Sequence, residues 1–283
     1  MEGAGDGGTR SDFDVVRDSA RTHEQDRYLA ALLAPARSRR DLVALAAFTG
    51  EVKKISHVVS EPHLAEIRLQ WWRDAVLAPQ AAATGNPVAD AFIAILAGRE
   101  DLHSAVDGWL DAVVDTFYRS APEGEAEFLS EIETLEGAPF LLAARICGAQ
   151  PAEDLLDMSR AAGRAYGLAR LGLTMAQSLA RGRVPLPQVA PAGWRRSDGA
   201  GSLDQAAAKA FVARYARAAL DHVRPRFRHG SPAQRAAMLP LALVEPYLRA
   251  CEKQGHDLMR DIGDVAPLVR VWRIWRAHLT GRL

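Results

Sequence analysis

Three aspartates spaced four residues apart are the side chains in this sequence best suited to bind a metal ion. If their segment is helical, Asp107, Asp111 and Asp115 lie on one face, and a row of carboxylates is how a helix presents oxygen ligands to Mg²⁺. The apolar residues of the same segment lie on the opposite face of that helix. A solvent-exposed acidic face is therefore the alternative interpretation.

Cationic side chains form a second group with chemical potential. Segment 158–197 contains no acidic residue but seven arginines, whose guanidinium groups bind phosphate or carboxylate through paired N–H groups. This composition favours an anionic ligand, with scattered solvent-facing arginines as the alternative. Lys53 and His57, one helical turn apart, add another cationic spot, although a surface or core role is simpler for the histidine.

Several function classes receive no support. The sequence has no HExxH, nucleophile elbow, P-loop or GxGxxG motif. Its 35 basic and 35 acidic side chains balance, so nothing attracts the whole chain to nucleic acid. Cys147 and Cys251 lie in apolar segments, which argues against a disulfide framework or a zinc site. We expect a cytoplasmic protein, either soluble or peripheral on the inner face of a membrane.

The elements that position these residues are predicted to be helices. Apolar residues recur at three- and four-residue steps along almost the whole chain, and strand-like alternation is hardly found, which predicts an all-α protein. We expect a flexible tail over 1–11 and one domain over 12–283. The longest non-helical stretch should be a surface loop at 184–201. Helices are predicted over 38–59, from Pro62 to Pro79, and over 87–97, 101–119, 124–147, 152–180, 203–227, 232–253 and 266–280.

The last of these helices combines aromatic and basic residues. Trp272 and Trp275 alternate with Arg270, Arg273 and Arg276, a pattern that suits a helix resting on a membrane surface. Docking onto the body of the protein is the alternative. Residues 267–280 are thus a candidate for peripheral membrane contact.

Four sequence blocks, in order along the chain, resemble the squalene/phytoene synthase family. They are DRYLAALLAP (26–35), RRDLVALAAF (39–48), EIRLQWWRD (66–74) and RGRVPLP (181–187). The resemblance implies the isoprenoid synthase fold, in which helices surround a central cavity. It also implies two aspartate-rich motifs that hold Mg²⁺, which binds the diphosphates of two prenyl diphosphates during head-to-head condensation.

This sequence departs from both metal-binding motifs of the family. Lys53 and His57 stand where the first motif has its two aspartates, and the second motif is replaced by TMAQSLA (174–180), which contains no acid. A lysine reverses the local charge and would repel Mg²⁺, so conventional catalysis and a Mg²⁺ cofactor are not expected. The same departures resemble the branch of the family that includes the mitochondrial complex I assembly factor.

Two hypotheses follow from the resemblance. In the first, the chain is a non-catalytic binding or assembly protein, whose partner is a prenyl diphosphate, another anionic lipid or a protein of respiratory complex assembly. In the second, it is an active prenyltransferase whose cationic side chains bind diphosphate directly, or whose metal is held by Asp107, Asp111 and Asp115. In both, we predict that an apolar cavity is lined or rimmed by Arg164, Tyr166, Arg170, Gln177, Arg181 and Arg183, with Lys53 and His57 facing them.

Overall fold

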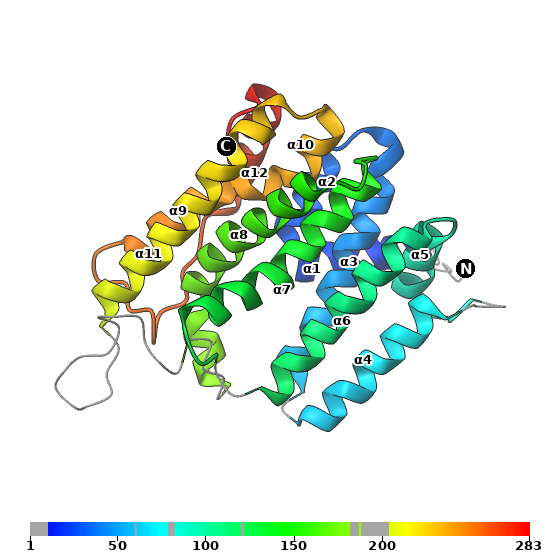
Figure 1. The fold of residues 1–283 in the computed structure, drawn as a ribbon, viewed down its shortest axis with the longest axis horizontal. Helices are drawn as coiled ribbons and strands as arrows, with labels where there is room; N and C mark the ends of the chain where they lie inside the picture. The colour runs from blue at the N-terminus through cyan, green and yellow to red at the C-terminus, as the bar shows by residue number, and fades with distance from the viewer. Residues whose placement is uncertain (1–10, 60, 79–82, 120–121, 182–186, 188–203) are drawn as a thin grey trace, which may run out of the picture.

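The computed structural model describes residues 11–59, 61–78, 83–119, 122–181, 187 and 204–283. Within these ranges the regular elements are all helices (Figure 1), which confirms the predicted all-α class. The expected tail at 1–11 lies outside the described residues except for its last residue, and the loop at 184–201 lies outside them except for Pro187. No helix in the described ranges is both long and apolar enough to cross a membrane.

Two N-terminal helices precede the first helix that the sequence predicts. Helix α1 (Asp12–His23) begins with a capping box, in which Ser11 and Asp14 satisfy each other's backbone N–H groups. Helix α2 (Gln25–Leu32) follows after the single residue Glu24. Both pack against α3 (Ala36–Val58), which is buried on most of its circumference. Helices α1 and α2 are short, at 12 and 8 residues, and each offers few apolar repeats, so pattern reasoning did not identify them.

Most of the remaining helices match the predicted ranges within two residues. The helix predicted over 232–253 is instead divided, because Pro240 cannot donate a backbone hydrogen bond and the chain forms a 3₁₀ turn, Leu239–Leu243, around it. The elements are α4 (Pro62–Leu77), α5 (Pro87–Leu96), α6 (His103–Tyr118), α7 (Glu125–Ile146), α8 (Glu153–Ala180), α9 (Gln205–His229), α10 (Pro232–Met238), α11 (Val244–Glu252) and α12 (Pro267–Thr280).

The long helices form a row with α3 packed behind it. Helices α9, α8, α7, α6 and α4 are neighbours in that order, and Figure 1 shows them running across the molecule in a similar direction. Helices α7 and α8 come closest at Gly137 and Gly163, where a Cβ on Gly163 would lie 2.3 Å from the Gly137 nitrogen. Gly163 and Gly167 of α8 therefore permit the close approach of α7.

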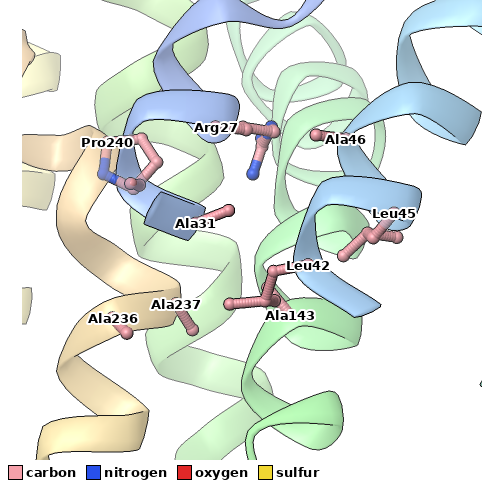
Figure 2. Close-up of a pocket in the computed structure, with 10 residues that line it drawn as sticks. Arg27, Ala31, Leu42, Leu45, Ala46, Ala143, Ala236, Ala237 and Pro240 are labelled. Carbon is pink, nitrogen blue, oxygen red and sulfur yellow. The ribbon is translucent and has the colours of Figure 1, made fainter. Parts of the chain in front are cut away.

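The buried apolar side chains form one connected core. At its centre the rings of Phe48 and Phe92 stack with centroids 3.9 Å apart, and Trp109 packs beside them. A gap of about 20 Å³ lies among alanine-rich parts of α2, α3, α7 and α10, and Figure 2 shows Arg27 reaching into it. That volume suffices for about one water molecule, so the interior at this point is closed to a larger ligand.

Candidate functional site

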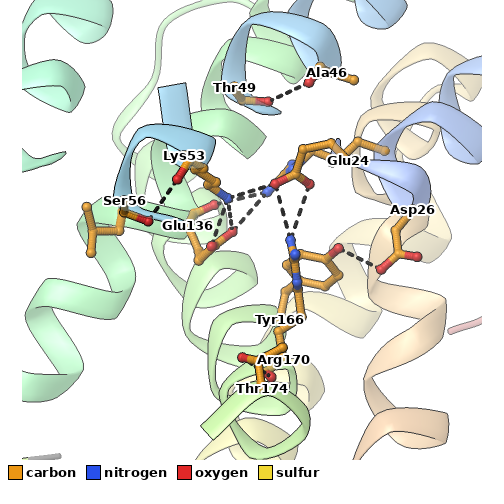
Figure 3. Close-up of polar contacts among 12 residues, drawn as sticks. Glu24, Asp26, Ala46, Thr49, Lys53, Ser56, Glu136, Tyr166, Arg170 and Thr174 are labelled. Carbon is orange, nitrogen blue, oxygen red and sulfur yellow. Dashed lines mark hydrogen bonds and ion pairs between the residues drawn. The ribbon is translucent and has the colours of Figure 1, made fainter. Parts of the chain in front are cut away.

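Two glutamates and three cations from α2, α3, α7, α8 and the α1–α2 junction form a largely buried ionic cluster (Figure 3). The Lys53 Nζ atom donates to Glu136 at 2.8 Å and to Glu24 at 3.2 Å. Arg170 Nη1 donates to both carboxylate oxygens of Glu24 at 3.2 Å. Arg27 completes the cluster, with nitrogen atoms 3.5 Å from Glu24 and 3.4 Å from Glu136. We call these five residues the buried ionic cluster.

The charges of this cluster are stabilised by one another. The Glu24 side chain is only 1% exposed, and burial alone would raise the pKa of its carboxyl. The charges of Lys53, Arg170 and Arg27 outweigh that effect and lower the pKa of Glu24 well below its usual range. The pKa of Glu136 is lowered in the same way, against burial and against the repulsion of Glu24. Both carboxylates are therefore ionised at neutral pH.

A further buried carboxylate, Asp26 at the start of α2, binds side chains from three other helices. It accepts hydrogen bonds from the hydroxyls of Tyr166, at 2.7 Å, and of Tyr247. Its other oxygen accepts from Arg270 of α12 at 3.0 Å. Burial and the Asp26 charge raise the pKa of both tyrosines, so the hydroxyls keep their protons and remain donors.

A pocket of about 290 Å³ lies beside these two groups. Its wall includes the segment before α12, where the Gly263 N–H donates to the Leu173 carbonyl at 3.1 Å. We expected an apolar cavity, whereas the lining of this pocket is mainly polar because Asp26 and its partners form one wall. The polar residues that line it are Thr22, His23, Glu24, Gln25, Asp26, Tyr166, Arg170, Thr174, Tyr247, Asp264 and Arg270.

The structure brings the predicted residues of α3 and α8 together in two pairs. Lys53 and Arg170 share the carboxylate of Glu24. One turn further along α3, His57 Nδ1 lies 2.8 Å from Nη1 of Arg181, the residue that follows α8, at an exposed position. These contacts bring side chains of the two segments together. The charges of Lys53 and Arg170, however, are compensated by glutamates that the sequence analysis did not consider.

Tyr166 adjoins the cluster, with its ring centroid 5.4 Å from the guanidinium carbons of Arg27 and Arg170, whereas the other predicted site residues are not part of it. Tyr166 lines the pocket, whereas Arg164 is ion-paired with Glu133 on α7. Gln177 is half-buried on α8 and does not line the pocket. Arg183 lies outside the described residues.

The acidic row on α6 is a surface feature. Asp107 and Asp111 are both ion-paired with Arg73 of α4, and Asp115 pairs with Arg119 at 3.3 Å. The Asp111 side chain is 62% exposed. The row therefore faces solvent and α4, outside the pocket, which removes the support for a metal site built on these three aspartates.

The residues present do not fit the Mg²⁺ ions that the family resemblance implies. Among the described residues, no group of three or more His, Cys, Asp or Glu side chains is placed to hold a metal ion. Glu24 and Glu136 do face each other, but the ammonium group of Lys53 lies between them. A divalent cation at this point would meet that positive charge at contact distance.

Sequence reasoning missed Glu24, Asp26, Glu136, Tyr247 and Arg270. Asp26 stands in the first block of the family resemblance, and Glu24 lies just before it. Glu136 lies next to the apolar run Gly137–Ala144, where a charged residue needs a partner. Those signals indicate buried charges, but no spacing rule links positions more than 100 residues apart.

Comparisons with known proteins agree with this architecture. The family model for squalene/phytoene synthase matches residues 20–282. Complex I assembly factor 6 of Rattus norvegicus is 28% identical over 114 residues, which are 40% of this chain and 33% of that protein. The match thus spans about a third of the length of this curated relative.

Two solved structures share the fold. The squalene synthase HpnC from Alicyclobacillus acidocaldarius superposes with a TM-score of 0.68 at 20% identity, over 87% of this chain and 95% of that one. A dehydrosqualene synthase in complex with ligand gives a TM-score of 0.70 at 15% identity, over 94% of both chains. Because the family model matches residues 20–282, nearly the whole chain, this chain belongs to the squalene/phytoene synthase family.

Proposed function

We propose that this chain is a non-catalytic member of its family that acts by binding a partner. The observation that carries the proposal is the position of Lys53, whose ammonium group is bound to Glu24 and Glu136 at 2.8–3.2 Å. The interior position at which the family resemblance places a metal-binding aspartate is thus occupied by a cation of the protein itself.

Electrostatics explain why this arrangement disfavours ionisation of a prenyl diphosphate. A leaving diphosphate needs positive charge that is free to bind it as the bond breaks. Here Lys53 and Arg170 already share the Glu24 carboxylate, and an incoming diphosphate would have to compete with that buried anion. Lys53, Arg164 and Arg170 are thereby engaged in internal ion pairs.

The size and lining of the pocket also support a binding role. At about 290 Å³ it lies at the small end of the range of about 300–1,000 Å³ that is typical for ligand sites. Two prenyl chains with their diphosphates would not fit there without opening of the surrounding helices. A single small polar group, such as a lipid headgroup, matches the polar lining better.

The partner that we propose is a component of respiratory complex I during its assembly. The support is the match to rat complex I assembly factor 6, together with the family resemblance to the branch that lacks both aspartate motifs. Deleting the gene from its own host should then lower NADH:quinone oxidoreductase activity in the membranes. Re-expression of the wild-type chain should restore it, and unchanged activity in the deletion strain would refute the assembly role.

The catalytic alternative is tested directly. In this test, purified protein is to be incubated with farnesyl or geranylgeranyl diphosphate, with Mg²⁺ or with EDTA. Diphosphate release is to be measured, with a known synthase as the positive control. We expect no release from the folded protein. Release that requires Mg²⁺, or that survives EDTA, would overturn the non-catalytic proposal and make this chain a prenyltransferase with an unusual diphosphate site.

A further inference from the structure

The C-terminal helix α12 exposes a continuous apolar stripe. Leu268 is 83% exposed, and the other large apolar side chains on the same face of the helix are each at least 43% exposed. Of the sixteen large apolar side chains that are exposed among the described residues, six belong to this 14-residue helix. Steps of three and four residues place five of them on one face, namely Leu268, Val271, Trp272, Trp275 and Leu279.

The opposite face of α12 is anchored to the protein. Ile274 and Ala277 are buried, and Arg270 donates to Asp26 at 3.0 Å and to Asp264 at 3.0 Å. Arg273 Nε donates to the Ala242 carbonyl at 3.4 Å. One face of α12 is thus packed on the body of the protein, which is one of the two alternatives that the sequence left open for this helix. These contacts hold the apolar stripe on the outside, so rotation of the helix cannot bury it.

Positive charge accompanies the stripe. Residues 265–283 contain four arginines and no acid, and Arg276 is exposed beside the tryptophans. Burial, together with the positive charges of Arg276, Arg249 and Arg224, lowers the pKa of Arg273, and Glu245 is the acid that opposes them. Arg270 is neutralised by Asp26 and Asp264, whereas Arg273 and Arg276 repel each other and add positive charge to this surface.

We propose that α12 docks this protein on the surface of an anionic lipid bilayer, with Trp272 and Trp275 at the level of the headgroups. Tryptophan rings favour that level because they are apolar with one polar N–H group, and arginines beside them attract anionic headgroups. At 14 residues the helix is about 21 Å long, which suits a helix lying in the plane of the interface.

A second exposed stripe, on α4, provides the matched control. Leu64, Ile67 and Trp71 are exposed there, and Trp71 has the same 43% exposure as Trp275. The charges of α4 are compensated, however, since Arg73 is ion-paired with two aspartates of α6. Our proposal therefore assigns membrane binding to α12 and none to α4. It does not depend on the function proposed above, because it concerns a different surface.

The test is flotation of the full-length protein with vesicles of phosphatidylcholine alone or with about a third of phosphatidylglycerol. We expect flotation with the anionic vesicles, weakened by salt because exposed charges are screened. Trp275→Ala should lower the partition coefficient about tenfold, since an interfacial tryptophan contributes on the order of 1.4 kcal/mol. Arg276→Gln should lower it less, and Trp71→Ala should leave it unchanged. All three positions are exposed, and circular dichroism checks that each variant is folded.

Several results would overturn the proposal. These are absence of flotation with anionic vesicles, equal flotation with neutral ones, or an equal loss in Trp71→Ala and Trp275→Ala. Size-exclusion chromatography tests a second copy as the occupant. A dimer that Trp275→Ala dissociates, with vesicle binding intact, would show that the stripe binds another copy of this chain instead of lipid.

Discussion

The buried ionic cluster and the acidic row on α6 both pair carboxylates with cations, yet they differ in almost every physical respect. Glu24 is 1% exposed and binds three cations, whereas Asp111 is 62% exposed and pairs with Arg73 alone. A buried charge that loses its partner has no water to replace it, whereas an exposed one is solvated at once. Carboxylates that look alike in the sequence thus contribute very differently to the free energy of unfolding.

The largest effect should come from removing the central cation of the cluster. Lys53→Met leaves Glu24 and Glu136 facing each other with only the two arginines, and breaking a buried ion pair costs about 3–5 kcal/mol in unfolding free energy. Urea denaturation followed by circular dichroism measures this loss. Lys54→Met is the matched control, because the Lys54 side chain is 41% exposed and, among the described residues, pairs with Glu51 alone at 3.4 Å; it should change stability by less than about 0.5 kcal/mol. Equal effects of the two variants would contradict the contrast.

A smaller loss is expected when Asp26 becomes neutral. Asp26→Asn removes the charge that accepts hydrogen bonds from Arg270 and two tyrosines, and a hydrogen bond to a charged group contributes about 1.5–3 kcal/mol. We therefore expect a loss of about 2–3 kcal/mol in the same denaturation experiment. Asp264→Asn is the control, since Asp264 also binds Arg270 but is 75% exposed. A larger loss for the control would show that α12 is anchored from its exposed side.

Acid should weaken the contribution of Lys53. The pKa of Glu24 is lowered in the folded protein from an ordinary value of 4.5, so the stability that it contributes is complete above about pH 4.5 and is lost as pH falls toward the folded pKa. In Lys53→Met the folded pKa of Glu24 is higher, and protonation relieves the unpaired charge earlier. The stability difference between wild type and Lys53→Met should therefore shrink by about 1 kcal/mol between pH 6 and pH 3.5. A difference that is constant or grows would contradict this linkage.

The smallest effect is expected at the acidic row. Asp111→Asn breaks an exposed ion pair with Arg73, which contributes about 0–1 kcal/mol. Differential scanning calorimetry should show a melting temperature close to that of wild type, with and without added Mg²⁺. Stabilisation by Mg²⁺ that this substitution abolishes would instead identify the row as a metal site.

Much of the fold could be predicted from the sequence because helix formation is mostly local. The apolar period of α3, α7 and α8 placed these helices within two residues of their observed ends, and Pro62 and Pro267 marked the starts of two others. Helices α1 and α2 were missed, because at 12 and 8 residues each offers few apolar repeats. The division at Pro240 was missed as well.

The candidate site was predictable only in part. The replacement of an aspartate by Lys53 can be recognised along the chain, and so can the lack of acids from Met158 to Arg181. The anion partners could not be predicted, because Glu24 lies 29 residues from Lys53 and Glu136 lies 83 residues from it. Without these glutamates the cationic residues suggested an anion-binding site. With them, the charges of Lys53 and Arg170 are already neutralised.

The sequence by itself determined the all-α class, most helix boundaries and the charge reversal at Lys53, since propensity, periodicity and residue type are properties of the chain. Only the tertiary structure decided which charges are free. It brings Glu24, Lys53, Glu136 and Arg170 to contact distance and leaves the aspartates of α6 in solvent. The reason is that the energy of a charge depends on its burial and on neighbours distant in sequence, which no local pattern records.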